Sequence, residues 1–394
     1  MDKRESPWQI FVIFLKLGLT SFGGPVAHLG YFREAFVVRH RWLSEQAYAD
    51  LVALCQFLPG PASSQAGLSI GLSRSGYRGA LAAWAGFTLP SAIVLVLVAY
   101  GYQSLGQILP YGVLAGLKIV ALAVVAQAVW GMANSLCQGT LRISLMLLSA
   151  CVVLVSGSIL SQIGVMMIAA LVGLFLIRPD SPGANDGLNI AISRKTGILW
   201  LMGFFLLLTG LPLMQQLFPG QLLAMIDAFY RAGALVFGGG HVVLPLLQAE
   251  TVASHWVSAD AFLAGYGVAQ AVPGPLFTFS AFLGASMQQE PAGITGAIIC
   301  LLAIFLPSFL LVFAALPFWQ GIRSSHKARS ALAGVNAAVV GILLAALYDP
   351  VWTRSIHSPG EFAFALVACV ALVYWKLKPW AVVIGSAVAG AFLL

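Results

Sequence analysis

The sequence predicts an all-α polytopic membrane protein made of two inverted-topology repeats with broken or re-entrant helices, and about 9–13 membrane segments. Three observations lead to this fold class. The chain of 394 residues is 60% hydrophobic and only 8% charged, whereas a soluble domain carries about 25% charged residues. Apolar runs recur along the whole length, and about 20 such residues cross a bilayer as a helix. Finally, one set of helix-breaking motifs occurs twice in the same order.

The first repeat, residues 1–177, contains two predicted helix breaks. The first is Phe22-Gly23-Gly24-Pro25 and the second is Phe57-Leu58-Pro59-Gly60-Pro61. Glycine weakens a helix, and proline cannot continue one. The helices predicted around these breaks are Trp8–Ser21, Val26–Val38, Tyr48–Leu58, Ala62–Leu72, Gly79–Tyr100, Leu109–Ala133, Leu141–Gly157 and Ile159–Ile177.

A connecting region, residues 178–217, separates this repeat from the second one, residues 218–394. It consists of the polar linker Arg178–Lys195 and one further span, Gly197–Leu217. The second repeat has its own breaks at Phe237-Gly238-Gly239-Gly240 and Val272-Pro273-Gly274-Pro275. Its predicted helices are Leu222–Val236, Ala261–Val272, Leu276–Ser286, Gly293–Leu316, Arg329–Tyr348, Phe362–Trp375 and Pro379–Leu394.

The two halves match in register, which indicates an internal duplication. The separation between equivalent residues stays between 214 (56 to 270) and 218 (115 to 333). The ordered matches are Phe22-Gly23-Gly24 with Phe237-Gly238-Gly239, Trp42-Leu43-Ser44 with Trp256-Val257-Ser258, Gln56 with Gln270, Pro90-Ser91 with Pro307-Ser308, and Ala115-Gly116 with Ala333-Gly334.

Basic residues predict the orientation in the membrane, because cytoplasmic loops are enriched in Lys and Arg. If each half opens with two re-entrant hairpins, about nine crossings result, and Arg354 is the one basic loop residue outside. A version with about thirteen crossings also leaves Arg33, Arg39 and Arg41 outside, so the first version is preferred. Both versions predict a cytoplasmic N-terminus and oppositely oriented halves. The first apolar segment, from Trp8, has no small-residue cleavage site, so we expect it to be retained.

The breaks are the predicted binding site, because irregular backbone at membrane depth survives only against protein or a water-filled cavity. A broken helix presents free N–H groups that favour an anion. A tight interhelical turn is the alternative interpretation of each Pro-Gly-Pro. The predicted anion-binding positions at the breaks are Gly23, Gly24, Pro59, Gly60, Pro61, Ser63, Ser64, Gln65, Gly238, Gly239, Pro273, Gly274, Pro275 and Thr278.

Charged residues inside apolar segments are further candidates, since burying a charge at membrane depth is costly and usually functional. Lys16 and Arg231 each lie six residues before a break phenylalanine, and Lys118 is a third cation. We expect Lys16 and Arg231 to face one central anion. The alternative is that each reaches the headgroups or pairs with a carboxylate.

Two candidate titratable residues follow the first break of each repeat. His28, Glu34, His241 and Glu250 are candidates for proton coupling, because histidines and buried carboxylates exchange protons near neutral pH. The alternative is that Glu34 pairs with an arginine at the surface and that the histidines bond backbone carbonyls.

The residue types and motifs of the sequence also argue against several other classes of protein. The sequence has no paired carboxylates, Ser-His-Asp set or metal-ligand cluster at workable spacing, so we predict no catalytic residue, metal or cofactor. The net charge of +7 reflects loops on one side of the membrane rather than nucleic-acid binding. The five cysteines lie scattered in apolar segments and indicate packing. A lipid-modifying enzyme and a channel stay as alternatives to a transporter.

Four segments resemble the signature segments of the chromate ion transporter (CHR) family in its long two-domain form. They are "FGGPVAHLGYFREAFV", "FLPGPASSQAGLSIG", "FGGGHVVLPLLQAETV" and "QAVPGPLFTFSAFLG". The resemblance implies an inner-membrane transporter that expels chromate, confers chromate resistance and uses the proton motive force. Sulfate, another tetrahedral dianion, or a different small oxyanion is the alternative cargo. A homodimer is compatible with the sequence, which does not specify the oligomeric state.

Overall fold

The structure is a computed structural model that describes residues 5–22, 24–105, 111–156, 159–177, 192–237, 242–319 and 325–393. Every regular element within these ranges is a helix, which confirms the all-α prediction. Among the described residues, five helices are long and apolar enough to cross a membrane. They are Ala62–Ser104, Gly112–Leu136, Arg194–Leu217, Gly293–Phe318 and His326–Ser355. The length and composition of these helices therefore indicate a multi-pass membrane protein.

The first repeat follows the predicted order of helices and breaks. Its helices are α1 (Pro7–Thr20), α2 (Gly24–Arg33) continued by the π-helical turn η1 (Glu34–Arg39), α3 (Glu45–Phe57), α4 (Ala62–Leu105), α5 (Tyr111–Leu136), α6 (Thr140–Ser156) and α7 (Ile159–Leu176). Helix α4 joins two predicted helices end to end. The joint lies at Ser75 and Gly76, where the backbone is not helical and Gly76 has φ +61°.

The second repeat has the same order after the peripheral connecting helix α8 (Arg194–Leu217). Its helices are α9 (Gln221–Ala234), α10 (Val243–Thr251), α11 (Ala259–Ala269), η3 (Leu276–Thr278), α12 (Phe279–Ala285), α13 (Gly293–Ala315) with η4 (Leu316–Phe318), α15 (His326–Ala346) with η5 (Leu347–Trp352) and α16 (Thr353–Ser355), α17 (Pro359–Val373) and α18 (Pro379–Leu393). The sequence predictions missed α10, which is the counterpart of α2.

The repeated Trp-x-Ser motif forms the tip of a helical hairpin in each half. Ser44 and Ser258 cap helices α3 and α11, because each hydroxyl accepts a hydrogen bond from the third amide of its helix. Directly before each Trp-x-Ser tripeptide, the chain reverses through a left-handed residue, Arg41 with φ +51° and His255 with φ +57°. The duplication therefore extends to backbone conformation.

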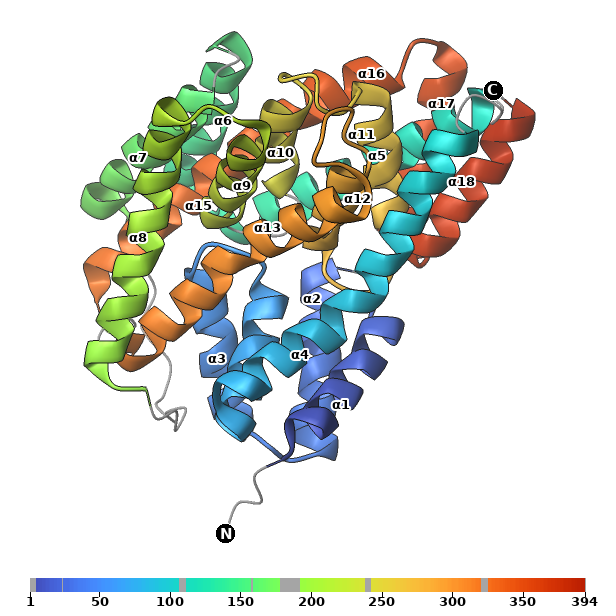
Figure 1. Cartoon of the computed structure of the whole chain (residues 1–394). Coiled ribbons are helices and arrows are strands. Elements are labelled where there is room, and N and C mark those ends of the chain that lie inside the picture. Colours follow the sequence, from blue (N-terminus) through green and yellow to red (C-terminus); the bar gives the residue numbers. More distant parts are fainter. Residues whose placement is uncertain are drawn as a thin grey trace.

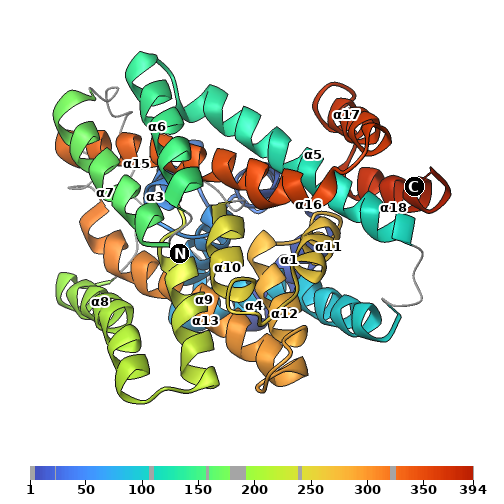
Figure 2. The same ribbon diagram turned by 90° about the horizontal axis from the view of Figure 1, so that it is seen from above.

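The repeats are interlocked rather than placed side by side. Helix α5 packs against α17 and α18 of the second repeat, and α15 packs in the same way against α6 and α7 of the first. Equivalent glycines permit the close approach. A Cβ atom on Gly116 would lie 2.1 Å from the Ser386 carbonyl oxygen, and one on Gly334 would lie 1.9 Å from that of Ala169. Helices α5 and α15 run next to each other across the middle (Figure 2).

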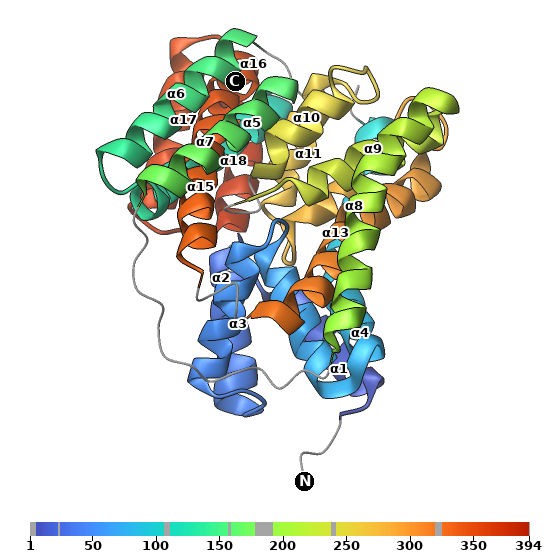
Figure 3. The same ribbon diagram turned by 90° about the vertical axis from the view of Figure 1, so that its left-hand side faces the viewer.

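Equivalent hairpins point to opposite ends of the molecule. Helices α1–α3 lie in the lower part of Figure 1, on the side of the N-terminus, and α9–α11 lie in the upper part. Figure 3 shows the same separation from the side. The two repeats are therefore inverted, as predicted, and their broken ends come together between the two hairpins.

Candidate anion-binding site

The four breaks meet through a reciprocal pair of backbone hydrogen bonds. The Gly60 amide of the first Pro-Gly-Pro donates to the Val236 carbonyl over 2.7 Å, and Val236 directly precedes the glycine-rich break of the second repeat. The Gly274 amide of the second Pro-Gly-Pro donates to the Ser21 carbonyl over 3.0 Å, and Ser21 directly precedes the glycine-rich break of the first repeat. Each half thus supplies the partner for the other half's break, and backbone groups that the breaks free are satisfied inside the protein.

The central residue of each Pro-Gly-Pro turn has a backbone conformation and a close packing that favour glycine. Gly60 has φ +120° and Gly274 has φ +108°, which are values that other residues adopt only with strain. A Cβ atom on Gly60 would lie 2.7 Å from Ser308 Oγ, and one on Gly274 would lie 2.8 Å from Ser91 Oγ. The repeated Pro-Ser pairs therefore pack against the opposite repeat's break, a role that their in-register match did not lead us to assign.

Buried polar side chains surround this junction. The His28 ring contacts the Ser21 carbonyl through Nε2 at 3.1 Å and the Ser63 hydroxyl through Nδ1 at 3.4 Å. Gln65 Nε2 donates to the Pro59 carbonyl over 2.7 Å. Several neighbouring polar atoms have no hydrogen-bond partner among the described residues, namely Ser21 Oγ, Ser64 Oγ, Gln65 Oε1, Gln270 Nε2, Ser280 Oγ and Ser308 Oγ. Buried polar groups normally have a partner, so these atoms are candidates for hydrogen bonds to a polar ligand or water.

The two repeats contribute differently to the junction. Helix α4 starts directly after Pro61, whose carbonyl accepts the first helical hydrogen bond, from Gln65. The amides of the first three residues of α4 therefore lack intrahelical acceptors and point out of the helix start. In the second repeat the chain after Pro275 makes a 3-10 turn, and the Thr278 hydroxyl donates to the Pro275 carbonyl. The predicted anion donors are thus concentrated on the first repeat.

The cation nearest in sequence to the second glycine break is Arg231, and it is paired with two carboxylates. Its guanidinium contacts Asp227 Oδ2 through Nε at 3.0 Å and through Nη2 at 2.8 Å, and it contacts Glu250 Oε1 through Nη2 at 3.2 Å. The sequence analysis missed Asp227, although an acid one helical turn before Arg231 in an apolar segment indicates an ion pair. The second repeat thus carries a partly buried cluster of one guanidinium and two acids.

The other charged candidates lie outside this cluster. Lys16 is exposed on the face of α1 that carries the exposed Val12 and Leu19, so the structure does not place it opposite Arg231. Glu34 pairs with Arg39 at the surface. Lys118 of α5 forms an ion pair of 2.6 Å with Asp260 of α11, which links the two repeats.

Some predicted positions cannot be located. Gly23, Gly238, Gly239 and His241 lie outside the described residues. Gly24 begins α2 with φ +76°. Pro273 follows α11 within the second break. Among the described residues, no three His, Cys, Asp or Glu side chains are grouped as a metal site.

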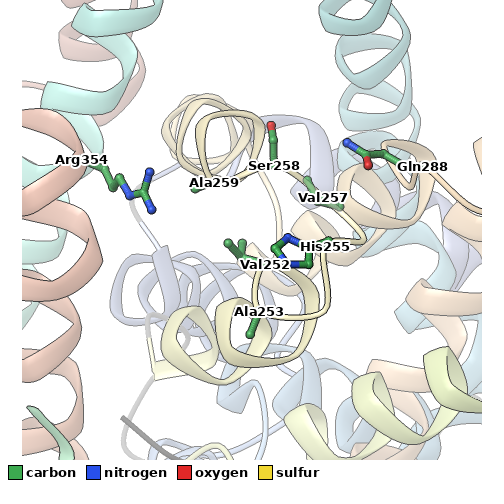
Figure 4. Close-up of a pocket in the computed structure, with 8 residues that line it drawn as sticks. All are labelled: Val252, Ala253, His255, Val257, Ser258, Ala259, Gln288 and Arg354. Atoms are coloured by element: carbon green, nitrogen blue, oxygen red, sulfur yellow. The ribbon is translucent and has the colours of Figure 1, made fainter. Parts of the chain in front are cut away.

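A separate cavity of about 470 Å³ lies at the tip of the α10–α11 hairpin. It is lined by Val252, Ala253, His255, Val257, Ser258, Ala259, Gln288 and Arg354. Figure 4 shows the Arg354 guanidinium facing Ala259 and Ser258 across this space. The cavity belongs to the end of the molecule opposite the N-terminus (Figure 1), so it offers a cation to an anion at that surface.

Comparisons with known proteins agree with the repeat architecture. The chromate transporter family matches residues 8–174 and 223–391, one region in each repeat. A probable chromate transport protein of Synechococcus elongatus is 28% identical over 97% of this chain and 94% of its own length. A chromate transport protein of Cupriavidus metallidurans is 26% identical over 97% and 92%.

A shorter relative matches less than half of this chain. The uncharacterized transporter YwrB of Bacillus subtilis is 30% identical over 43% of this chain and 85% of its own length. No solved structure matches the chain significantly. Because the family matches both repeats over most of their length, the chain belongs to the chromate transporter family.

Proposed function

We propose that this protein exports chromate across the inner membrane, uses the proton motive force and confers chromate resistance. The names of the Synechococcus and Cupriavidus relatives support chromate as the cargo. That the matched family and relatives are transporters also argues against an enzyme. Export, the energy source and the cytoplasmic N-terminus follow from the resemblance and from the distribution of basic residues.

The observation that carries the proposal is the meeting of the breaks around unpartnered buried polar atoms. A tetrahedral dianion binds well to free helix-start amides and hydroxyl donors. The start of α4 offers such amides, and Ser64 and Ser308 offer hydroxyls without partners among the described residues. The dianion binds at this junction, with Arg231 as the principal cation of the site.

The geometry also favours alternating access over a continuous pore. Each Pro-Gly-Pro is bonded to the other repeat's glycine break, so a tilt of one repeat against the other changes both ends of the junction together. The Arg354 cavity is the outer vestibule into which the anion is released. A channel is the competing mechanism, and it would conduct without a coupled gradient.

Chromate accumulation in cells tests the proposal. Cells that produce the protein are expected to accumulate less chromate than control cells, and Arg231→Gln is expected to abolish the difference at an equal amount of membrane-inserted protein. Lys16→Gln is the matched control, because Lys16 is exposed on α1. Export by the Arg231→Gln variant at the wild-type rate would remove Arg231 from the site.

Everted vesicles separate chromate from the alternative cargoes. Chromate uptake with an imposed membrane potential and pH gradient is measured in the presence of excess sulfate. Weak inhibition supports chromate as the preferred cargo, whereas complete inhibition at low sulfate concentrations favours a general oxyanion transporter. Flux that persists after both gradients are collapsed would support a channel.

A further inference from the structure

The cluster of Asp227, Arg231 and Glu250 has more negative than positive charge when all three groups are ionised. It contains two carboxylates and one guanidinium, and both acids contact that guanidinium. Asp227 Oδ1 is buried and has no hydrogen-bond donor among the described residues. Two acids that share one cation, one of them with an unsatisfied buried oxygen, form a site with an affinity for a proton.

The neighbouring helices bring no charge that would offset this excess. Helix α9 packs against α8, α10 and α13. Helix α13 has Cys300 as its single titratable residue, α10 has Glu250 alone, and the charges of α8 are confined to its first two residues, Arg194 and Lys195. Helix α15, which packs against α10, has its basic residues within its first four positions, His326, Lys327 and Arg329. The Tyr230 hydroxyl on α9 donates to the Phe204 carbonyl, and His241 lies outside the described residues.

The two acids hold Arg231 in different ways. Asp227 lies one turn away on the same helix, receives two guanidinium N–H groups, and its side chain is 7% exposed. Glu250 comes from a different helix, makes one contact of 3.2 Å, and its side chain is 16% exposed. An anion that approaches Arg231 therefore displaces Glu250 more easily than Asp227.

We propose that the oxyanion binds together with a proton, which Glu250 takes up as it gives way to the anion at Arg231, while Asp227 keeps the guanidinium in position. This inference rests on the proposed function. A dianion cannot approach a cluster that is already negative without strong repulsion, and protonation of Glu250 leaves Asp227 and Arg231 as a neutral pair with a guanidinium N–H free. Negative charge on the ligand and a proton on Glu250 thus favour each other.

Joint binding of the oxyanion and a proton determines which gradient drives export. A dianion that leaves with one proton removes one net negative charge from the cell. The membrane potential, negative inside, then drives export, whereas the pH gradient opposes it. Proton–anion antiport would require the opposite relation, in which anion binding expels the proton.

Chromate binding to the purified full-length protein tests the linkage. We measure affinity in detergent across alkaline pH, where chromate itself stays a dianion, and we expect the dissociation constant of the wild type to rise by up to about tenfold per pH unit. Glu250→Gln is expected to bind chromate with little pH dependence. Asp227→Asn is expected to bind more weakly at every pH, because the guanidinium loses its two-point support. Glu45→Gln is the control, since Glu45 is an exposed acid that pairs with Arg33.

A measurement on the wild type alone keeps the inference testable if the variants fail to fold. Adding chromate to weakly buffered protein at alkaline pH is expected to raise the pH, as the site takes up a proton. Chromate binding without proton uptake, or with proton release, would overturn the linkage and leave the proposed function intact. No chromate binding by the wild type would instead count against the proposed function.

Discussion

Substitution of Gly60 by alanine tests whether the Pro-Gly-Pro turn is built for the cross-repeat junction. The backbone at φ +120° strains any residue with a Cβ atom, at a cost of about 1–3 kcal/mol. The new Cβ atom also meets Ser308 Oγ and Gln65 Nε2, each at 2.7 Å, and overpacking of this kind costs about 1–3 kcal/mol. Both contacts are ends of side chains that can rotate, so the second cost is at the low end, and the sum is about 2–4 kcal/mol.

This energy corresponds to a loss of about 30- to 700-fold in the population of the assembled junction. We expect Gly60→Ala to lower both the thermal unfolding temperature in detergent and chromate export per inserted molecule. Gly30→Ala makes the same chemical change in α2, where a Cβ atom would meet nothing within 4 Å, and is expected to be neutral or slightly stabilising. If Gly60→Ala unfolded and exported like Gly30→Ala, the junction would not have the tight geometry described above.

Three further variants probe the packing, the binding site and the vestibule. Gly334→Ala places a Cβ atom 1.9 Å from the Ala169 carbonyl oxygen, so we expect it to destabilise the fold by about 1–3 kcal/mol. An unchanged unfolding temperature would contradict the packing of α15 on α7. Ser64→Ala removes a hydroxyl that has no partner among the described residues, so we expect normal stability. The KM for export is expected to rise about 10- to 100-fold, because a hydrogen bond to a charged ligand is lost. An unchanged KM would exclude Ser64 from the site. Arg354→Gln is expected to slow the binding of chromate offered from the outer face, chiefly at low ionic strength, where electrostatic steering is strongest. Equal losses at all salt concentrations would argue against a vestibule.

The sequence specified the breaks, the duplication and the inverted arrangement because these depend on local chemistry. Proline and glycine end helices wherever they occur, and an in-register match is visible without coordinates. The partners of the breaks were not predictable, since Gly60 bonds Val236 and Gly274 bonds Ser21 only after the two repeats interlock. Helix α10 was missed because Pro245 lies within its first turn and masks its helical pattern.

The charged residues show the limit of arguing from repeat symmetry. Lys16 and Arg231 occupy equivalent positions, but the acid one turn before Arg231, Asp227, has Val12 as its counterpart before Lys16. Arg231 therefore enters a buried charge cluster, whereas Lys16 has no acid on its own helix face and lies exposed. Equivalent positions in a duplicated sequence share backbone geometry, and their side chains diverge with their neighbours.

Disulfide cross-linking between the repeats tests the central claim, that the breaks of both halves converge, most directly. In a variant without the five native cysteines, Ser91→Cys is combined with Gly274→Cys, because a Cβ atom on Gly274 would lie 3.2 Å from Ser91 Cβ, within reach of a disulfide. A protease site in the polar linker lets the halves separate on a denaturing gel unless they are cross-linked. Ala121→Cys with Gly267→Cys, 3.8 Å apart by the same measure, is the positive control, and each single variant controls for strain. We expect both pairs to hold the cleaved halves together after oxidation. Separation of the halves in the Ser91–Gly274 variant would contradict the convergence of the breaks, provided that the control pair stays linked and the Gly274→Cys single variant keeps the wild-type unfolding temperature.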